Sequence, residues 1–229
     1  MTIPEKAVRW GLSIAADQSH GYSQQSRWGP NFDCSSFAIS CYKTGAGVPI
    51  DTSVVNFTGN LQYLTRYGFK DVSKNINFST GSGLKKGDII YYHKSGTNGH
   101  AAVYVGNGQI VHARGQSYGS AKTGDQGTEI AVTAYYSGSF NKCMRYAGTV
   151  DTPASTTPKR YEVKTSLPII KKGSVSRAVK VWQTVIGVNA DGEFGPVTDS
   201  ATRQFQKANK LEVDGEVGPD TWKAGLGGI

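Results

Sequence analysis

The residue best placed for nucleophilic chemistry is Cys34, in the segment Asn31-Phe-Asp-Cys-Ser-Ser-Phe37. A loop turns into a predicted helix here, so the thiol should meet free backbone N–H groups and the positive end of the helix dipole. Both favour the thiolate, the attacking form of cysteine, and the same N–H groups can stabilise the oxyanion of a tetrahedral intermediate. Cys41 and Cys143 suit the commoner role of a small buried side chain, and three cysteines without CxxC spacing make no disulfide framework. The sequence predicts Cys34 as a nucleophile.

A thiol nucleophile needs a base within hydrogen-bond reach, and the candidates are the chain's four histidines: His20, His93, His100 and His112. His20 and His93 fall in predicted loops, where we expect them to be solvated. His100 and His112 fall in two predicted strands that are joined by Gly106-Asn107-Gly108. The strand pair therefore supplies the stronger candidates for the base.

The register of this hairpin decides whether the two histidines meet. If residues 106–108 form a three-residue loop, Ala102 faces His112, and parity places His100 on the same sheet face. Diagonal neighbours on one face lie roughly 7–8 Å apart, within reach of two imidazoles. A two-residue turn would place them on opposite faces. With the longer loop, His100 is the predicted base and His112 the residue that orients it, as in a catalytic triad.

Cys34, His100 and His112 are also possible ligands of a catalytic zinc ion, since cysteine and histidine are its usual donors. No HExxH pattern accompanies them. We therefore prefer the metal-free interpretation and expect no cofactor.

The order of predicted elements indicates an α+β domain over residues 1–150, with helices followed by an antiparallel sheet. Apolar spacing predicts helices at 2–17 and 33–42 and strands at 88–92, 100–105 and 109–114. Residues 46–80 and 115–140 show no clear pattern and are expected to be loops with fragments of structure.

A second domain is predicted at 167–229, after a linker at 151–166 that is rich in proline and threonine. The box Asp191-Gly-Glu-Phe-Gly-Pro-Val-Thr198 recurs as Asp214-Gly-Glu-Val-Gly-Pro-Asp-Thr221. Each box pairs a turn signal with a helix start, so the unit should be small and helical. Its central helix is expected to bury Ala201, Phe205 and Ala208 on one face.

Charge is unevenly distributed: residues 1–150 carry 14 Lys/Arg against 8 Asp/Glu, whereas residues 165–229 carry 8 against 7. The basic excess of the first domain can attract nucleic acid, anionic lipid or an anionic cell wall, and charge alone does not distinguish these partners. No Lys/Arg run or base-stacking motif indicates nucleic acid, and no apolar run is long enough to insert into a membrane. Residues 1–18 lack the apolar core of a signal peptide, and a monomer is expected.

Several motifs together resemble the NlpC-type cysteine peptidases of bacterial walls, and most of all their phage-lysin amidase branch. They are Tyr22, Arg27-Trp-Gly-Pro-Asn-Phe-Asp-Cys-Ser-Ser-Phe37, Leu84-Lys-Lys-Gly-Asp-Ile-Ile90 and Gly99-His-Ala-Ala-Val-Tyr-Val-Gly-Asn-Gly-Gln-Ile-Val-His112. The resemblance implies a papain-like fold with Cys34 as nucleophile, His100 as base and His112 orienting it.

The same resemblance implies that the substrate site is lined by Tyr22, Asp33 and Ser35, with Asp33 facing a substrate amine. The chain departs from the pattern in two places. Ser36 stands where many relatives have glycine, and Gln24–Trp28 replaces a shorter Trp-Gly-Gly turn. These departures bear on which bond is cleaved.

Residues 169–226 resemble the three-helix peptidoglycan-binding module of wall hydrolases, through the two repeated boxes, Phe205-Gln-Lys207 and Trp222. Together the resemblances imply a phage endolysin that cleaves the muramoyl–L-alanine amide or a bond within the peptide stem of peptidoglycan. Such an enzyme would stay in the host cytoplasm until it is released to the wall. The alternative is an inactive protein that only binds the wall.

Overall fold

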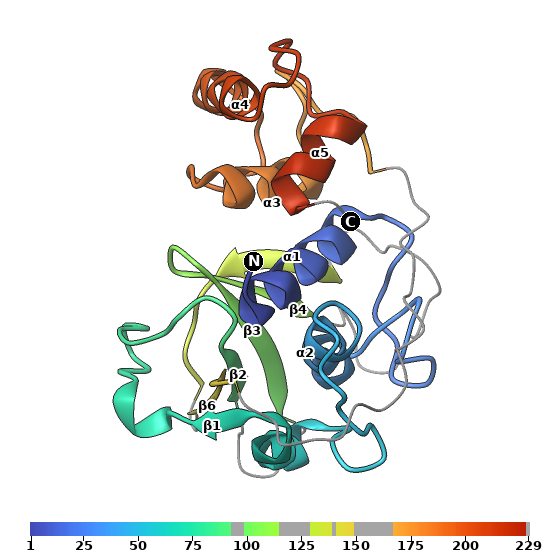
Figure 1. Cartoon of the computed structure of the whole chain (residues 1–229), viewed down its shortest axis with the longest axis vertical. Helices are drawn as coiled ribbons and strands as arrows, with labels where there is room; N and C mark the ends of the chain where they lie inside the picture. Colours follow the sequence, from blue (N-terminus) through green and yellow to red (C-terminus); the bar gives the residue numbers. More distant parts are fainter. Residues whose placement is uncertain (93–98, 115–128, 139–140, 149–166, 228–229) are drawn as a thin grey trace.

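The computed structural model describes residues 1–92, 99–114, 129–138, 141–148 and 167–227, and everything below concerns these residues. Two helices, α1 (Ile3–Ala16) and α2 (Cys34–Lys43), pack against an antiparallel sheet. A smaller helical unit lies beyond α1 (Figure 1). The predicted α+β class and the C-terminal helical domain are confirmed, and the predicted linker at 151–166 lies outside the described residues.

Both helices begin at side-chain caps that the sequence supplies. Thr2 caps α1 in a capping box with Glu5, and Pro4 fits the first turn, where a missing N–H does no harm. Asp33 caps α2 by accepting a hydrogen bond from the Ser36 N–H at 2.7 Å. The cap fixes the position at which α2 starts, and the first residue of that helix is Cys34.

Within the described residues, six strands form one antiparallel sheet in the order β1-β6-β2-β3-β4-β5. Their bounds are β1 Phe69–Asp71, β2 Ile89–Tyr92, β3 His100–Gly106, β4 Gln109–Ala113, β5 Ile130–Ala134 and β6 Asn141–Tyr146. Two 3₁₀ helices, Thr58–Tyr67 and Ser73–Asn75, flank β1. Strands β1 and β5 and both 3₁₀ helices come from the two segments that showed no clear sequence pattern.

The hairpin between β3 and β4 differs from the predicted loop, although its outcome is the same. Gly106 pairs with Gln109, so the turn has two residues, Asn107 and Gly108, both with positive φ as a type I′ turn requires. A register shift between Tyr104 and Gly106 then inserts one extra residue into β3. The three-residue loop was wrong, but the bulge restores the parity that brings His100 and His112 to one face.

The C-terminal unit contains α3 (Arg177–Ile186), α4 (Pro196–Ala208) and α5 (Pro219–Leu226). Its two repeated boxes are held by equivalent glutamines. Gln183 donates to Asp191 at 2.7 Å and accepts from the Gly192 N–H at 2.8 Å. Gln206 does the same with Asp214 at 2.7 Å and the Gly215 N–H at 2.9 Å. The boxes are thus structural devices of the module.

The buried face of α4 is not the predicted one. Thr198, Thr202 and Gln206 are buried, whereas Ala208 is exposed and Ala201 and Phe205 are only partly covered. Polar side chains are stable in this interior because they find partners: Thr202 accepts a hydrogen bond from the Trp182 indole at 2.9 Å. Apolar periodicity could not reveal a core helix that is lined by hydrogen-bonded polar groups.

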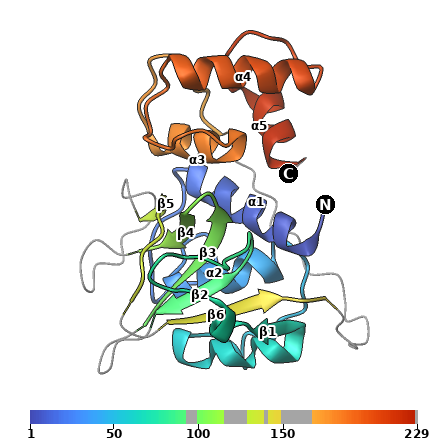
Figure 2. The same ribbon diagram turned by 90° about the vertical axis from the view of Figure 1, so that its left-hand side faces the viewer.

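Helix α1 is covered on all sides, with nine of its 14 residues buried between Ala7 and Ala16. One side packs on α2 and the sheet, and the opposite side packs on α3 and α5 of the C-terminal unit (Figure 2). Arg177 reaches across this junction and donates hydrogen bonds to the carbonyls of Asp17 at 2.6 Å and Ile130 at 3.3 Å. The module thus covers a side of α1 that the first domain leaves open.

Candidate active site

The Cys34 thiol lies where the start of α2 meets the start of β3. Its Sγ is 3.8 Å from the Gly99 carbonyl oxygen and 4.0 Å from Thr58 Oγ1. The side chain is 8% exposed, so it is covered but adjoins solvent. Cys41 and Cys143 are completely buried, as predicted for small core side chains. Of the three thiols, Cys34 is therefore the one that a substrate can reach.

The electrostatic environment of Cys34 differs from the one expected at a helix start. Burial, followed by the adjacent Asp33 carboxylate, raises the pKa of this thiol above its ordinary value. Hydrogen bonds from the backbone of Ala101, from Thr58 and from the backbone of Ser35 act in the opposite direction and are outweighed. The expected preference for thiolate is therefore not met at rest, and the thiol needs a base to remove its proton.

His100 and His112 are in direct contact on one face of the sheet. His100 Nε2 lies 2.8 Å from His112 Nδ1, and the two rings meet edge to face at 4.9 Å between centroids. Cys34 Sγ contacts the carbonyl of Gly99, which precedes His100, and its pKa responds to the backbone of Ala101, which follows it. The structure thus brings His100 and His112 into contact and places Cys34 beside the backbone on either side of His100.

One assignment of ring protons satisfies the whole chain of polar contacts. If His100 carries its proton on Nε2 and donates to His112 Nδ1, His112 carries its own on Nε2 and faces Thr133 Oγ1 at 3.4 Å. The Thr133 hydroxyl donates in turn to the Ala134 carbonyl at 3.2 Å. His100 Nδ1 is then an unprotonated acceptor, which is the state a general base requires.

Both histidines are neutral in this environment. Burial, with a smaller effect of Arg114, lowers the pKa of His100 to about 4. Burial, His100 and Arg114 lower the pKa of His112 to about 3. A neutral histidine can act as a general base, and a protonated thiol needs one before it can attack.

Tyrosines flank this site on two sides. The pKa of Tyr22 is raised by burial and then by Cys34, which places its phenol near the thiol. Cys34 also contributes to raising the pKa of Tyr136, after burial. The ring centroid of Tyr136 lies 6.2 Å from that of His112 and 5.1 Å from that of Tyr92, on which it stacks. The backbone of Tyr22 is held in place by Glu129, because the Tyr22 N–H donates a hydrogen bond to the buried Glu129 carboxylate at 2.7 Å. Tyr22 was singled out from the sequence, whereas Tyr136 and Glu129 were not.

Asp33 and Ser35 lie beside the thiol, but their polar groups already have partners. Arg27 Nε is 2.7 Å from Asp33 Oδ2, and Arg27 Nη2 donates to Ser35 Oγ at 2.8 Å. Ser35 Oγ donates to Asp33 Oδ1 at 3.0 Å. Asp33 was expected to face a substrate amine, but in the structure its carboxylate faces the guanidinium of Arg27. Arg27 belongs to the segment Gln24–Trp28, where the sequence departs from its resemblance.

His20 differs from expectation, because it is 2% exposed rather than solvated. Its Nδ1 lies 2.5 Å from the Pro30 carbonyl oxygen and its Nε2 lies 3.3 Å from Asp17 Oδ2. These contacts tie the end of α1 to the loop that leads into α2, which is a structural role. His93 falls outside the described residues.

Neither a metal centre nor a membrane span is found in the described part of the chain. No three His, Cys, Asp or Glu side chains there converge in a way that would hold a metal ion. No helix there is both long and apolar enough to cross a bilayer.

Comparison with known proteins assigns both parts of the chain. A model of the NlpC/P60 family matches residues 18–137, and a model described as a putative peptidoglycan-binding domain matches residues 183–224. An uncharacterised protein of Kitasatospora aureofaciens is 36% identical over 78 residues, which are 30% of this chain and 66% of that protein. The gamma-DL-glutamyl hydrolase of Bacillus subtilis is 34% identical over 85 residues, which are 34% of this chain and 19% of the hydrolase.

Among solved structures, NlpC1 from Trichomonas vaginalis is 16% identical, with 62% of this chain and 45% of that chain covered and a TM-score of 0.41. An NlpC/P60 family protein from Bacillus cereus is 19% identical, with 63% and 40% covered and a TM-score of 0.38. This chain spans 66% or less of the length of each of these four relatives.

Proposed function

The chain belongs to the NlpC/P60 family, and we propose that it is a peptidoglycan hydrolase in which Cys34 attacks an amide of the wall's peptide stem. One observation carries the proposal: the accessible thiol adjoins the strand start that bears His100, and His100 Nε2 lies 2.8 Å from His112. The C-terminal match to a peptidoglycan-binding domain supports peptidoglycan as the partner.

The reaction begins when the Cys34 proton moves to His100 Nδ1 as the sulfur attacks the carbonyl carbon of the amide. Backbone N–H groups at the start of α2 stabilise the resulting oxyanion. His100 then returns the proton to the departing amine, the C–N bond breaks, and an acyl thioester remains on Cys34. Water gives a proton to His100 and attacks the thioester, which releases a carboxylate and restores the thiol. His112 holds the orientation of His100 throughout.

Two bonds are candidates for cleavage. The phage-lysin resemblance favours the muramoyl–L-alanine amide, whereas the name of the Bacillus subtilis relative favours a γ-glutamyl bond within the stem. Both reactions use the same thioester chemistry, so the catalytic residues do not decide between them. The Arg27–Asp33 pair beside Cys34 makes selection for a free substrate amine less favourable, which is consistent with cleavage of stems still attached to glycan.

We assign wall binding by the C-terminal module to a shallow groove along α4. It is lined by Pro196, Val197, Ser200, Ala201 and Gln204. Val197 is 71% exposed although it is a large apolar residue, as expected of a surface that binds a ligand. Helix α4 lies on the side of the module away from the catalytic domain, where a polymer has access (Figure 2). We propose that this domain pair acts as a phage endolysin, made in the host cytoplasm and released to the wall.

Mass spectrometry of fragments from purified wall sacculi tests the proposal. An amidase leaves muramic acid termini without peptide, and an endopeptidase leaves shortened stems. If wall is bound but no fragment is released, the alternative of an inactive wall-binding protein is correct.

A further inference from the structure

Arg27 lies beside the proposed nucleophile without contacting the thiol in any hydrogen bond of the described structure. Its Nε is 2.7 Å from Asp33 Oδ2, and its Nη2 is 3.1 Å from Asp33 Oδ1, so the guanidinium holds both carboxylate oxygens. Nη2 also donates to Ser35 Oγ at 2.8 Å and to the Asn56 carbonyl. The outer face of the guanidinium is covered by the Trp28 ring, 5.3 Å from its centroid. Trp28 itself remains 42% exposed.

This ion pair differs from an ordinary surface pair, which contributes little because water screens both charges. The side chains of Arg27 and Asp33 are only 21% and 10% exposed. Arg27 approaches the two Asp33 oxygens with two different nitrogens: Nη2 donates a hydrogen bond to Oδ1, and Nε makes a close ion contact with Oδ2 without hydrogen-bond geometry. The single ammonium of a lysine could not make both contacts. An interaction of this kind can hold its partners in place.

The partners of Arg27 surround the thiol from two directions. Asp33 and Ser35 belong to the start of α2, which carries Cys34. Asn56 belongs to the loop that leads to Thr58, whose Oγ1 is 4.0 Å from Cys34 Sγ and donates to the Gly99 carbonyl at 3.5 Å. Arg27 therefore connects the helix start to the loop on the other side of the thiol.

Arg27 also opposes the charge that most directly disfavours the thiolate. The Asp33 carboxylate precedes Cys34 in the chain, and after burial it is the main cause that raises the pKa of the thiol. A guanidinium bound to both carboxylate oxygens reduces the negative potential at the sulfur. Two further titratable side chains of the described residues, Tyr22 and Tyr136, also interact electrostatically with Cys34, and the contact with the Gly99 carbonyl places the thiol beside the start of the strand that bears His100.

We propose that Arg27 is a positioning residue for Cys34: it neutralises the Asp33 carboxylate and ties the start of α2 to the loop at Asn56. The inference rests on the proposed function of Cys34 as the nucleophile. It adds to the proposed site a residue of the segment Gln24–Trp28, in which the sequence departs from the family pattern.

The pH dependence of Cys34 alkylation tests the electrostatic part. The full-length protein is treated with iodoacetamide and the modified cysteine is identified by peptide mass, with Cys41 and Cys143 protected by burial. Arg27→Gln should move the alkylation midpoint up by roughly one pH unit, and so slow the reaction about tenfold at pH 7. Asp33→Asn, which keeps a good helix cap, should move it down. The double variant should return close to the wild type.

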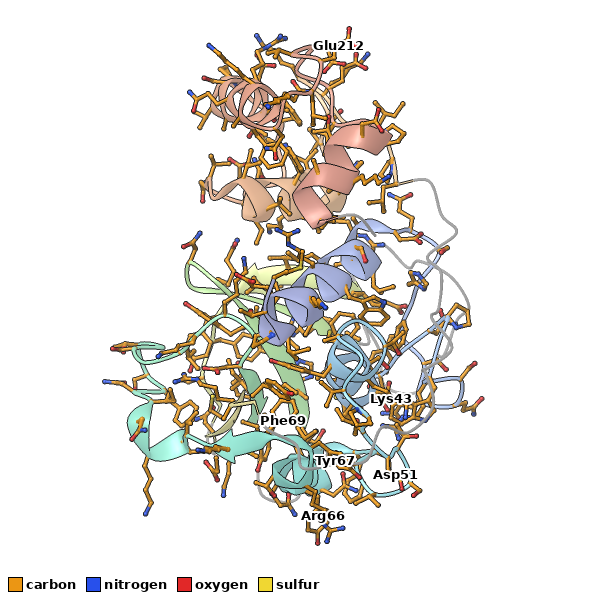
Figure 3. The ribbon with its side chains drawn as sticks, in the orientation of Figure 1. Lys43, Asp51, Arg66, Tyr67, Phe69 and Glu212 are labelled. Carbon is orange, nitrogen blue, oxygen red and sulfur yellow. The ribbon has the colours of Figure 1, made fainter. Side chains whose placement is uncertain are left out.

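Opposite shifts that cancel are the signature of charge, since a merely structural loss would move both single variants in the same direction. Shifts in the same direction, or no shift in Arg27→Gln, would overturn the electrostatic part. Arg66→Gln is the matched control, because Arg66 also lies over an aromatic ring, that of Tyr63 at 5.0 Å. Arg66 is exposed and lies at the far end of the 3₁₀ helix Thr58–Tyr67 from Thr58, the residue of that helix that contacts the thiol (Figure 3 labels Arg66). It should leave the alkylation profile unchanged.

Arg27→Lys tests the tie to Asn56. Lysine keeps the charge but lacks the planar guanidinium that reaches Asp33 and Asn56 together. The alkylation midpoint should therefore stay near that of the wild type, while kcat for wall fragments falls about tenfold. An Arg27→Lys variant with wild-type kcat would contradict the proposed role of the contact between Arg27 and Asn56. Alkylation reports on the thiol whatever bond the enzyme cleaves, so a negative alkylation result would overturn the role of Arg27 and leave the proposed function standing. The proposed function is tested separately, because an active Cys34→Ser variant would contradict it.

Discussion

Lowering the pH from 8 to 5 should destabilise the catalytic domain, because it forces protons onto a histidine pair that the fold keeps neutral. The pKa of His100 is about 4 and that of His112 about 3 in the folded protein, against 6.5 in the absence of the fold. Between these values the unfolded chain binds more protons than the folded one, so stability is complete above pH 6.5 and is lost as the pH falls. At pH 5 the loss is about 2 kcal/mol for each histidine.

Urea unfolding followed by circular dichroism at pH 8, 6.5 and 5 measures this loss. His112→Asn removes one titrating group and keeps a hydrogen-bond acceptor near His100 Nε2, so the variant should lose about half of the pH dependence. The window ends at pH 5 because most carboxylates titrate below it. A wild-type free energy of unfolding that stays flat from pH 8 to 5, or an equal drop in the variant, would refute the assignment of a buried neutral pair.

Three further predictions concern the orienting histidine His112, the domain junction and the module. In wall-hydrolysis assays His112→Asn should retain a good part of the rate, while His112→Ala should lose roughly 10²–10⁴-fold; equal rates for both would remove its orienting role. Arg177→Gln should lower the melting temperature of the catalytic domain by several degrees, since two buried carbonyls lose a charged donor, whereas the exposed Arg203→Gln should not; no difference between them would mean that the junction contributes nothing. Gln206→Ala removes the hydrogen bonds that hold the second box, so it should destabilise the module by about 2–4 kcal/mol and weaken sedimentation with sacculi; unchanged binding would contradict a structural role for the box.

The sequence was most informative where local physics decides the outcome. Cys34 at a capped helix start and the meeting of His100 and His112 on one sheet face both followed from short-range patterns. The hairpin reached its register by a different route, because a bulge near Val105 compensates for a turn one residue shorter than expected. Bulges carry no reliable sequence signal, so parity arguments across a turn can succeed or fail by one residue.

The features that were missed depend on contacts between distant parts of the chain. Strands β1, β5 and β6 were not recognised, because short strands show little periodicity of their own. The rise in the Cys34 pKa comes from burial, which no motif reports. The packing of the module on α1 also escaped prediction, because the contact joins segments that lie far apart in the chain.

The central claim, that Cys34 is the nucleophile, is tested most directly by wall hydrolysis with Cys34→Ser beside the matched control Cys41→Ser. Serine is a poor nucleophile with only a histidine as base, so Cys34→Ser should release no fragments while still sedimenting with sacculi. Cys41→Ser replaces a buried thiol that no step uses, and should keep its activity wherever it folds. Fragment release by Cys34→Ser at a rate close to that of the wild type would contradict the account.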